Sequence, residues 1–496
     1  MGFFKIFFSL IGLTLLSKVL GFLREILLSY YYGVSNIIDA YLVALTIPGV
    51  LFSFFSVAIS VSFIPVFSKV YENTEERNNF VNNILNIFIL VSSFIVVLTF
   101  IFAEYFVYIC APGFDEETKS LAIKFTRIFV VGVYFSCWIS IFSAFLNFFK
   151  KFTLVALAGI PFNLTILLSI ILSFYYGVYW LILGAVFGKL FEIIFLYPYI
   201  RKMNYSYKFY INLKDENARK IAFLSMPLIF SVAVNQINII VDKSIASTLQ
   251  VGAISAINYS HYLIELVIGI FVLTTVTIFF PDLAKSFNNK DKDAMKAISE
   301  KSFSIINLFV IPCCIFFIFQ TKKIISFVYE RGGFDTLAVN LTSDAFFFFS
   351  IGLLGLAYRE ILLRIYYAMH NTIVPVFNSI IGVLLNIILA LLLSKYYGIS
   401  GLALATSISA FLTAFLLFLN LRKLNINLNS ISILKCSIKK LSAAIFSILF
   451  LFFVSETIFL PLNLIIYFLS YIFFLFLLKD RSVLILFNKL KGKMEE

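Results

Sequence analysis

Charged side chains are scarce in this chain. Asp, Glu, Lys and Arg together make up 13% of its 496 residues, whereas 61% of the residues are hydrophobic. A soluble domain of this length needs a polar surface, and this composition does not supply one. The scarcity of charge therefore excludes an ordinary soluble enzyme or binding module and predicts a protein whose solvent is lipid.

Cysteines and catalytic motifs are also few. The five cysteines fall mostly within apolar stretches and show no CxxC or other metal-binding spacing, which excludes a disulfide framework and a zinc site. The sequence has no P-loop, no HExxH and no nucleophile-elbow motif. No loop is long enough to hold an enzymatic domain. We therefore predict that the chain is not an enzyme and carries no cofactor.

Long apolar stretches account for most of the sequence. A helix needs about 20 apolar residues to cross the hydrocarbon core of a membrane. About fourteen such stretches, separated by short loops, predict an all-α polytopic membrane protein. The predicted spans cover approximately residues 5–31, 36–67, 82–109, 122–148, 153–175, 178–200, 219–248, 254–287, 299–320, 338–368, 373–395, 399–421, 440–458 and 461–478.

The chain repeats itself 216 to 221 residues later. Residues 64–69 match residues 280–285, and residues 175–178 match residues 396–399. Six spans per copy are an even number, so the two copies are parallel repeats and form two lobes around a central cavity. The last two spans have no repeat partner. The predicted domains are 1–200 (N-lobe), 201–220 (cytoplasmic inter-lobe linker, expected as a short amphipathic helix on the inner leaflet), 221–423 (C-lobe) and 424–496 (two extra helices and a basic tail).

The net charge of +13 arises from basic residues that collect in alternate loops. Examples are Lys150 and Lys151, the loop 285–301, and the tail from Lys479 onward. This distribution follows the positive-inside rule and predicts that both termini are cytoplasmic. The positive charge is therefore a sign of membrane topology, and we expect no nucleic-acid partner.

Several charged residues nevertheless lie inside the predicted spans. Each costs roughly 2.5–3.5 kcal/mol on insertion scales, so it usually faces a wet cavity or a partner charge. Two interpretations stay open for most of them, substrate contact and ion pairing that lets helices pack, whereas we expect Lys189 to be an interfacial or packing residue. The residues concerned are Lys18, Arg24, Glu25, Asp39, Lys189, Glu192, Asp242, Lys243, Glu265, Arg359, Glu360 and Arg364.

Motifs around these charges resemble one known family. The first are residues 17–25 (SKVLGFLRE), 39–44 (DAYLVA) and 63–67 (FIPVF), and the likeness continues through 236–238 (QIN), 256–259 (AINY), 329–335 (YERGGFD), 364–368 (RIYYA) and 401–407 (GLALATS). Together they resemble the MurJ (MviN) lipid II flippases of the multidrug/oligosaccharidyl-lipid/polysaccharide exporter superfamily. The likeness covers essentially the whole chain.

The resemblance implies a specific function. It implies two six-helix lobes around a cationic cavity, with the two extra helices forming a groove for a polyprenyl tail. A bacterial cytoplasmic-membrane flippase of this kind moves an undecaprenyl-pyrophosphate-linked peptidoglycan precursor, lipid II, to the outer leaflet by alternating access. We expect a monomer whose partners are this lipid-linked glycan and membrane lipid. Export of another lipid-linked oligosaccharide, or of a drug by the same fold, stays open as the alternative.

The resemblance also implies substrate-binding positions. Lys18, Arg24, Asp39 and Glu265 match the family pattern, and Arg359 and Arg364 would add positive charge from the second lobe. Fixed cations in a low-dielectric cavity hold a pyrophosphate better than they would in water. Two departures weaken the match, because Phe52 and Tyr262 stand where the family usually has arginine.

The driving force has three candidates, the membrane potential, a proton gradient and a sodium gradient. The resemblance implies that Asp242 with Asn386 and Thr406 would form a Na⁺ site, and a carboxylate with neutral oxygen ligands suits a hard cation. Asp242 could instead form a salt bridge with a neighbouring helix. His261 is a candidate proton carrier because its ordinary pKa lies near neutrality, although a lone histidine on an apolar helix is more often a packing residue.

Overall fold

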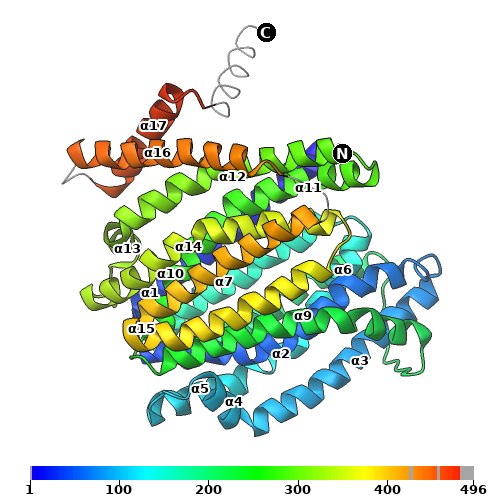
Figure 1. Cartoon of the computed structure of the whole chain (residues 1–496). Coiled ribbons are helices and arrows are strands. Elements are labelled where there is room, and N and C mark those ends of the chain that lie inside the picture. Colours follow the sequence, from blue (N-terminus) through cyan, green and yellow to red (C-terminus); the bar gives the residue numbers. More distant parts are fainter. Residues whose placement is uncertain (1–2, 424–427, 455–458, 481–496) are drawn as a thin grey trace. The chain divides into compact units, whose positions relative to one another are not determined.

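The computed structural model describes residues 3–423, 428–454 and 459–480, and all regular structure in these ranges is helical (Figure 1). The predicted tail beyond residue 480 lies outside the described residues. The elements are α1 (Phe3–Tyr32), α2 (Asn36–Phe67), α3 (Thr74–Ile101), α4 (Ala103–Cys110), α5 (Glu116–Phe129), α6 (Gly132–Phe148), α7 (Phe152–Tyr176), α8 (Tyr179–Arg201), α9 (Glu216–Ser247), α10 (Ala253–Val267), the π-helix η1 (Ile268–Val272), α11 (Leu273–Asn288), α12 (Lys292–Phe319), α13 (Thr321–Tyr329), α14 (Thr336–Ala368), α15 (Ile373–Lys423), α16 (Ser430–Val454) and α17 (Leu460–Leu477).

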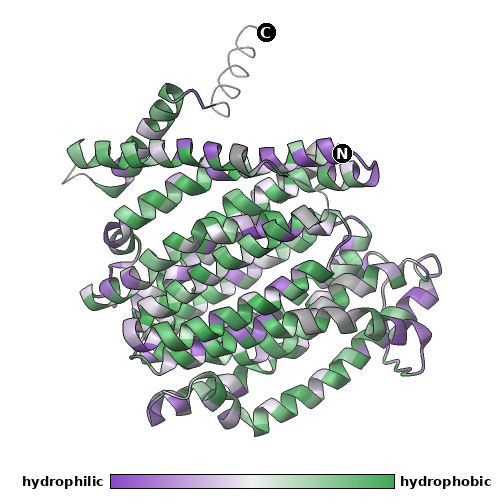
Figure 2. Cartoon of the chain, in the orientation of Figure 1, coloured by the Kyte–Doolittle hydropathy of each residue, from purple (hydrophilic) through white to green (hydrophobic). Residues whose placement is uncertain are grey.

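Hydrophobic residues cover most of these helices (Figure 2). Among the described residues, 10 helices are long and apolar enough to cross a membrane, or up to 11 if α5 and α6, bent by 43° at their junction, form one span. Large apolar side chains such as Phe453 (91% exposed) lie on the outside, where lipid satisfies them and water would not. The prediction of an all-α polytopic membrane protein is confirmed, and the count of about fourteen spans stays a prediction.

Helix α15 shows how two predicted spans appear as one element. Its 51 residues would extend about 75 Å at 1.5 Å per residue, far more than a bilayer needs. Gly398 interrupts it with a left-handed backbone (φ 56°, ψ −132°) that a glycine adopts without steric penalty. The break falls between the predicted spans 373–395 and 399–421. Conversely, the predicted third and fourth spans are each divided, at Phe102 and at Val130–Val131.

The chain packs as two compact units, Met1–Ser255 with Arg331–Asp335, and Ala256–Glu330 with Thr336–Glu496. In the first unit, α2 packs against α5, α6 and α9, and α7 packs against α1 and α8. In the second unit, α14 packs against α12 and α15, and α16 packs against α12 and α17. Packing therefore places α9 in the first unit. The predicted domain boundaries follow the sequence repeat, and they stay a prediction.

The inter-lobe linker differs from its expected form. Residues 202–215 are not helical, so the prediction of an amphipathic helix over 201–220 is wrong. Asparagines on α3 hold the linker instead. The amide groups of Asn82, Asn83 and Asn86 donate to linker carbonyls at residues 206, 212, 208 and 210 over 3.0–3.3 Å. These bonds satisfy backbone groups that a helix would otherwise satisfy internally.

Candidate functional site

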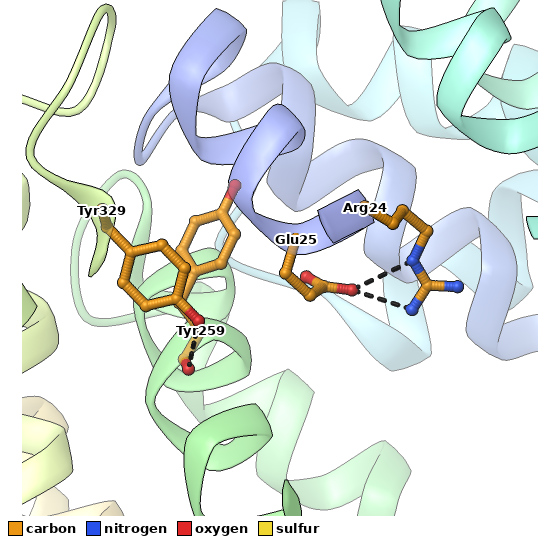
Figure 3. Close-up of polar contacts among 4 residues, drawn as sticks. All are labelled: Arg24, Glu25, Tyr259 and Tyr329. Carbon is orange, nitrogen blue, oxygen red and sulfur yellow. Dashed lines mark hydrogen bonds and ion pairs between the residues drawn. The ribbon is translucent and has the colours of Figure 1, made fainter. Parts of the chain in front are cut away.

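The charged turn of α1 contains an internal ion pair. Arg24 donates from Nε and Nη2 to Oε1 of Glu25 over 3.1 and 2.8 Å (Figure 3). The side chain of Glu25 is 4% exposed and that of Arg24 is 26% exposed, so the carboxylate is buried and the guanidinium reaches outward. Lys18, half-buried, lies further toward the start of the same helix. The pair fixes the direction of the guanidinium and leaves part of it accessible to an anion.

Asp39 is fully engaged in backbone contacts. Its Oδ2 accepts from the N–H of Gly252 over 2.9 Å, and its Oδ1 accepts from the N–H of Ser255 over 2.7 Å. The first N–H directly precedes α10 and the second lies in its first turn, where helix donors have no partner inside the helix. The residue is 2% exposed. Asp39 thus holds the N-terminus of α10 against α2, and its predicted contact with substrate stays a prediction.

Lys243 of α9 reinforces the same region. Its ammonium donates to the carbonyl oxygen of Leu42 over 2.7 Å and also to Thr46 Oγ1 on α2. It lies close enough to Asp39 for the opposite charges to attract. One residue earlier, Asp242 accepts from Asn238 Nδ2 over 3.0 Å. Lys243 was visible in the sequence as a charge within a span, and the structure gives it a packing role.

A second lysine, Lys189, lies beside α2 at a different position, near Phe52. The ammonium of Lys189 on α8 donates to Ser136 Oγ on α6 and lies 5.6 Å from the Phe52 ring centre and 5.5 Å from that of Phe129. A cation over two aromatic faces gains about 0.5–2 kcal/mol from each. Phe52 stands where arginine is expected from the family resemblance. The structure therefore places a cation from another helix beside that position.

The candidate residues of the second unit fall into two groups. On α10, His261 Nδ1 and Glu265 Oε1 are 3.6 Å apart, one helical turn from each other. On α14, Arg359 Nη2 lies 3.5 Å from Glu360 Oε1, and its charge also acts on His261. Glu265, 62% exposed at its side chain, is accessible, and Arg364 is half-buried further along α14. The structure thus associates His261, Glu265 and Arg359.

Asn386 and Thr406, two of the three residues predicted to bind Na⁺, are in direct contact. Asn386 Nδ2 donates to Thr406 Oγ1 over 3.3 Å and to Ser409 Oγ over 3.1 Å. Ser409 was not predicted, although its position three residues after Thr406 on one helix face is a visible signal. Asp242, the third predicted residue, belongs to the first unit. Within the described chain, no group of three or more His, Cys, Asp or Glu side chains could hold a metal ion.

The 329–335 motif is anchored in each unit separately. In the second unit, the Tyr329 hydroxyl donates to the carbonyl oxygen of Tyr259 over 3.2 Å (Figure 3). The following residues pack with the first unit, where the N–H of Gly333 donates to the carbonyl oxygen of Tyr30 over 2.7 Å. A Cβ on Gly33 would overlap the carbonyl of Gly333. The glycines therefore permit a close backbone contact at the end of α1.

Comparison with known proteins gives a consistent result. The family model described as lipid II flippase MurJ matches residues 28–475. A "Probable lipid II flippase MurJ" from Buchnera aphidicola subsp. Baizongia pistaciae is 29% identical over 471 residues, covering 93% of this chain and 92% of that protein. A "Lipid II flippase MurJ" from Burkholderia cenocepacia is 26% identical over 462 residues, covering 90% of this chain and 89% of that protein.

Solved structures give the same fold. A structure titled "Lipid II flippase MurJ, inward closed conformation" superposes with a TM-score of 0.82 at 28% identity, covering 93% of this chain and 96% of that one. An inward-facing multidrug resistance MATE family transporter of the MOP superfamily superposes with a TM-score of 0.72 at 11% identity, covering 84% of this chain and 96% of that one. The latter likeness shows the fold alone.

Proposed function

The chain belongs to the family of the lipid II flippase MurJ, and on that premise we propose that it moves lipid II from the inner to the outer leaflet of the bacterial cytoplasmic membrane by alternating access. The match of the family model over residues 28–475 is the observation that carries the proposal. The family is one of transporters. Charges retained inside apolar helices support the same function, because they are costly unless they face substrate or a partner.

Arg24 is the residue we propose as the main ligand of the pyrophosphate. Its guanidinium is directed by Glu25 and is partly exposed, so it can bind an anion without a large change of rotamer. Lys18 adds a second cation on the same helix. We propose Arg359 and Arg364 as cations of the second lobe and Glu265 as a polar contact. We propose Asp39 as a further residue of the site, and its two backbone hydrogen bonds support a role as a positioning residue.

Another lipid-linked oligosaccharide is the second candidate substrate. Phe52 and Tyr262 replace arginines expected from the family, and the cation over the Phe52 ring is Lys189, which is already engaged with Ser136. A cavity with different cations can favour a different sugar or peptide on the same pyrophosphate carrier. Export of a drug by the same fold is a weaker alternative, because the MATE likeness concerns the fold alone.

We also propose a sodium gradient as one driving force, beside the membrane potential or a proton gradient. Asn386, Thr406 and Ser409 form a contiguous group of neutral oxygen-bearing side chains, and Asp242 would supply the carboxylate. Transport assayed in vesicles with NaCl and with KCl tests this point. A sodium stimulation that Thr406→Val and Asp242→Asn both remove would support the site, and equal rates in the two salts would exclude it.

Both termini are proposed to lie in the cytoplasm, and the working unit is proposed to be a monomer. The alternation of basic loops supports the orientation. Reaction of single introduced cysteines with a membrane-impermeant reagent in whole cells would test it. Labelling of a cysteine at the Lys150 turn without permeabilising the inner membrane would contradict the orientation.

Complementation is the decisive experiment. The chain is expressed in a bacterium whose own lipid II flippase is depleted, and lipid II reaching the outer face is measured by its cleavage with an externally added lipid II-degrading toxin. Restored growth and cleavage would support lipid II as substrate. Failure of both, with the protein present in the membrane, would favour another lipid-linked glycan.

Variants connect this readout to the site. Arg24→Ala is expected to reduce flipped lipid II about tenfold or more, because it removes a charge-assisted contact with the pyrophosphate. Arg201→Ala, an exposed arginine at the end of α8, is the matched control and should leave the level unchanged. Normal flipping by Arg24→Ala would remove Arg24 from the proposed site.

A further inference from the structure

We propose that a pocket in the second unit binds the headgroup of an anionic membrane phospholipid, at a site separate from the residues proposed to bind the transported substrate. The pocket has a volume of about 490 Å³ and lies where the turn between α11 and α12 meets the turn between α14 and α15. That size suits a small ligand or a lipid headgroup. Its lining includes Phe287, Lys290, Lys292, Met295, Met369 and Asn371.

The internal repeat explains why a pocket exists here. In the first unit, the Phe67 ring at the end of α2 packs 4.8 Å from Phe148 and 6.2 Å from Phe149, between centroids, and Phe148 lies 5.1 Å from Tyr71. These four rings fill the space between the α2–α3 turn and the α6–α7 turn.

The second copy has smaller side chains at three of the four matching positions, and at the fourth Phe287 matches Tyr71. Leu283 matches Phe67 within the aligned motif. The helices α6 and α14 end with the same left-handed residue geometry, at Lys150 (φ 56°) and His370 (φ 56°), which aligns Ala368 and Met369 with the two phenylalanines. Folded interiors are normally close-packed, so space that is filled in one copy and open in the other indicates a function.

The rim of the pocket carries positive charge. Lys290 and Lys292 are exposed, and in the described part of the chain neither forms a salt bridge. The carboxylate of Asp291 between them accepts from the N–H of Ala294 over 2.9 Å and is thereby engaged as the cap of α12. The rim therefore offers two ammonium groups to a phosphodiester, which binds lysine as a point charge.

The floor and the surroundings favour a lipid over a soluble phosphate. Met295 and Met369 are 2% and 8% exposed and give the pocket an apolar floor. Directly after the Asn371 cap of α15, Ile373 and Phe377 are 67% and 63% exposed, one helical turn apart on the same face. In a membrane protein such a face contacts acyl chains. A phospholipid would place its phosphate at the lysines and its chains along Ile373 and Phe377.

Native mass spectrometry of the purified full chain tests the proposal, with phosphatidylglycerol as the probe and phosphatidylcholine as the zwitterionic comparison. We expect one phosphatidylglycerol to be retained under conditions that strip phosphatidylcholine. The K290Q/K292Q double variant should lower its occupancy about tenfold, as expected for the loss of charge-assisted contacts worth about 1.4 kcal/mol. Met369→Phe, which restores an aromatic ring as in the first copy, should lower occupancy with all charges kept.

The control pair is K285Q/K296Q, which removes the same charge from the two helices flanking the same turn but outside the pocket lining. It should retain the lipid. If both double variants lost phosphatidylglycerol equally, the lipid would be held only by general attraction to a basic surface, and the proposal would be overturned. Full retention of the lipid by K290Q/K292Q and by Met369→Phe would also overturn it. Displacement of the lipid by millimolar glycerol phosphate would overturn the choice of a lipid and indicate a soluble phosphate ligand. Lipid II flipping is not part of the readout, so this result is independent of the proposed transport function.

Discussion

The carboxylate of Asp39 on α2 accepts a 2.7 Å hydrogen bond from the backbone N–H of Ser255, more than two hundred residues further along the chain. Together with the bond from Gly252, it joins α2 to the start of α10 inside the first unit. A charge that the sequence marks as a candidate substrate ligand is thus already used by the fold. A substrate-binding role and a helix-capping role of Asp39 predict different effects of the same substitution.

Asp39→Asn is predicted to destabilise the protein by about 1–3 kcal/mol, because an amide can accept with only one of its two polar atoms and leaves a buried donor unsatisfied. The loss of attraction to Lys243 adds to this effect. Thermal unfolding of the detergent-purified protein measures the change. Asp115→Asn is the control, since Asp115 is exposed and makes no side-chain cap. An Asp39→Asn protein that is as stable as the parent but inactive would instead support direct substrate contact.

The α3 asparagines should control the order of the linker. Asn82→Ala with Asn86→Ala removes bonds to the carbonyls of residues 206, 208 and 210, and also the acceptor of the Tyr205 hydroxyl. Burial raises the pKa of Tyr205, so its hydroxyl stays protonated and would lose its partner. We expect faster proteolysis and hydrogen exchange within residues 202–215.

Asn79→Ala, one turn before Asn83 on the same helix, is the control for this experiment. It should leave the exchange of the linker unchanged. If the double variant exchanged like the parent, the linker would have to be held by contacts other than these side chains.

The sequence predicted the helices much better than the contacts of their charges. Apolar length alone located α2 and α7 to within a residue, because lipid imposes one strong requirement on every span. The same argument predicts that a buried charge has a partner, but it does not identify that partner. Asp39 and Lys243 looked like candidate ligands, and their partners are backbone groups and a threonine whose proximity depends on how α2, α9 and the turn before α10 pack.

Short polar segments were harder still. The linker was expected to be a helix because it is basic and amphipathic, and the asparagines on α3 prevent this by supplying its hydrogen bonds. Asn386 and Thr406 were named as candidate Na⁺ ligands from the family resemblance, and their contact with each other and with Ser409 comes from the packing of the two halves of α15. Local periodicity cannot supply such long-range pairings.

Gly33→Ala is predicted to disturb the contact between the end of α1 and residues 331–335. Gly33 has a φ of +57°, and a Cβ there would overlap the carbonyl of Gly333, a backbone group that cannot rotate away. We expect the hydrogen bond from Gly333 to Tyr30 to lengthen or break, with faster hydrogen exchange at residues 331–335 and impaired transport.

Gly49→Ala is the matched control for Gly33→Ala, because a Cβ at Gly49 meets nothing within 4 Å. It should leave exchange and transport unchanged, or stabilise α2 slightly. Unchanged exchange in the Gly33 variant would show that the loop accommodates a methyl group by shifting as a whole.

Lys189 is predicted to supply the positive charge that Phe52 lacks. If it does, Lys189→Met should reduce transport, because methionine keeps the length and apolar contacts of the side chain but not its charge. Phe52→Arg in that background would return a cation to the neighbouring position and should restore transport, whereas Phe52→Arg alone would place two cations together and lower the unfolding temperature. Rescue of transport with no change in the unfolding temperature is the result that a structural role of Lys189 does not produce. If Lys189→Met transports normally, the ammonium acts only in packing with Ser136 and Phe129.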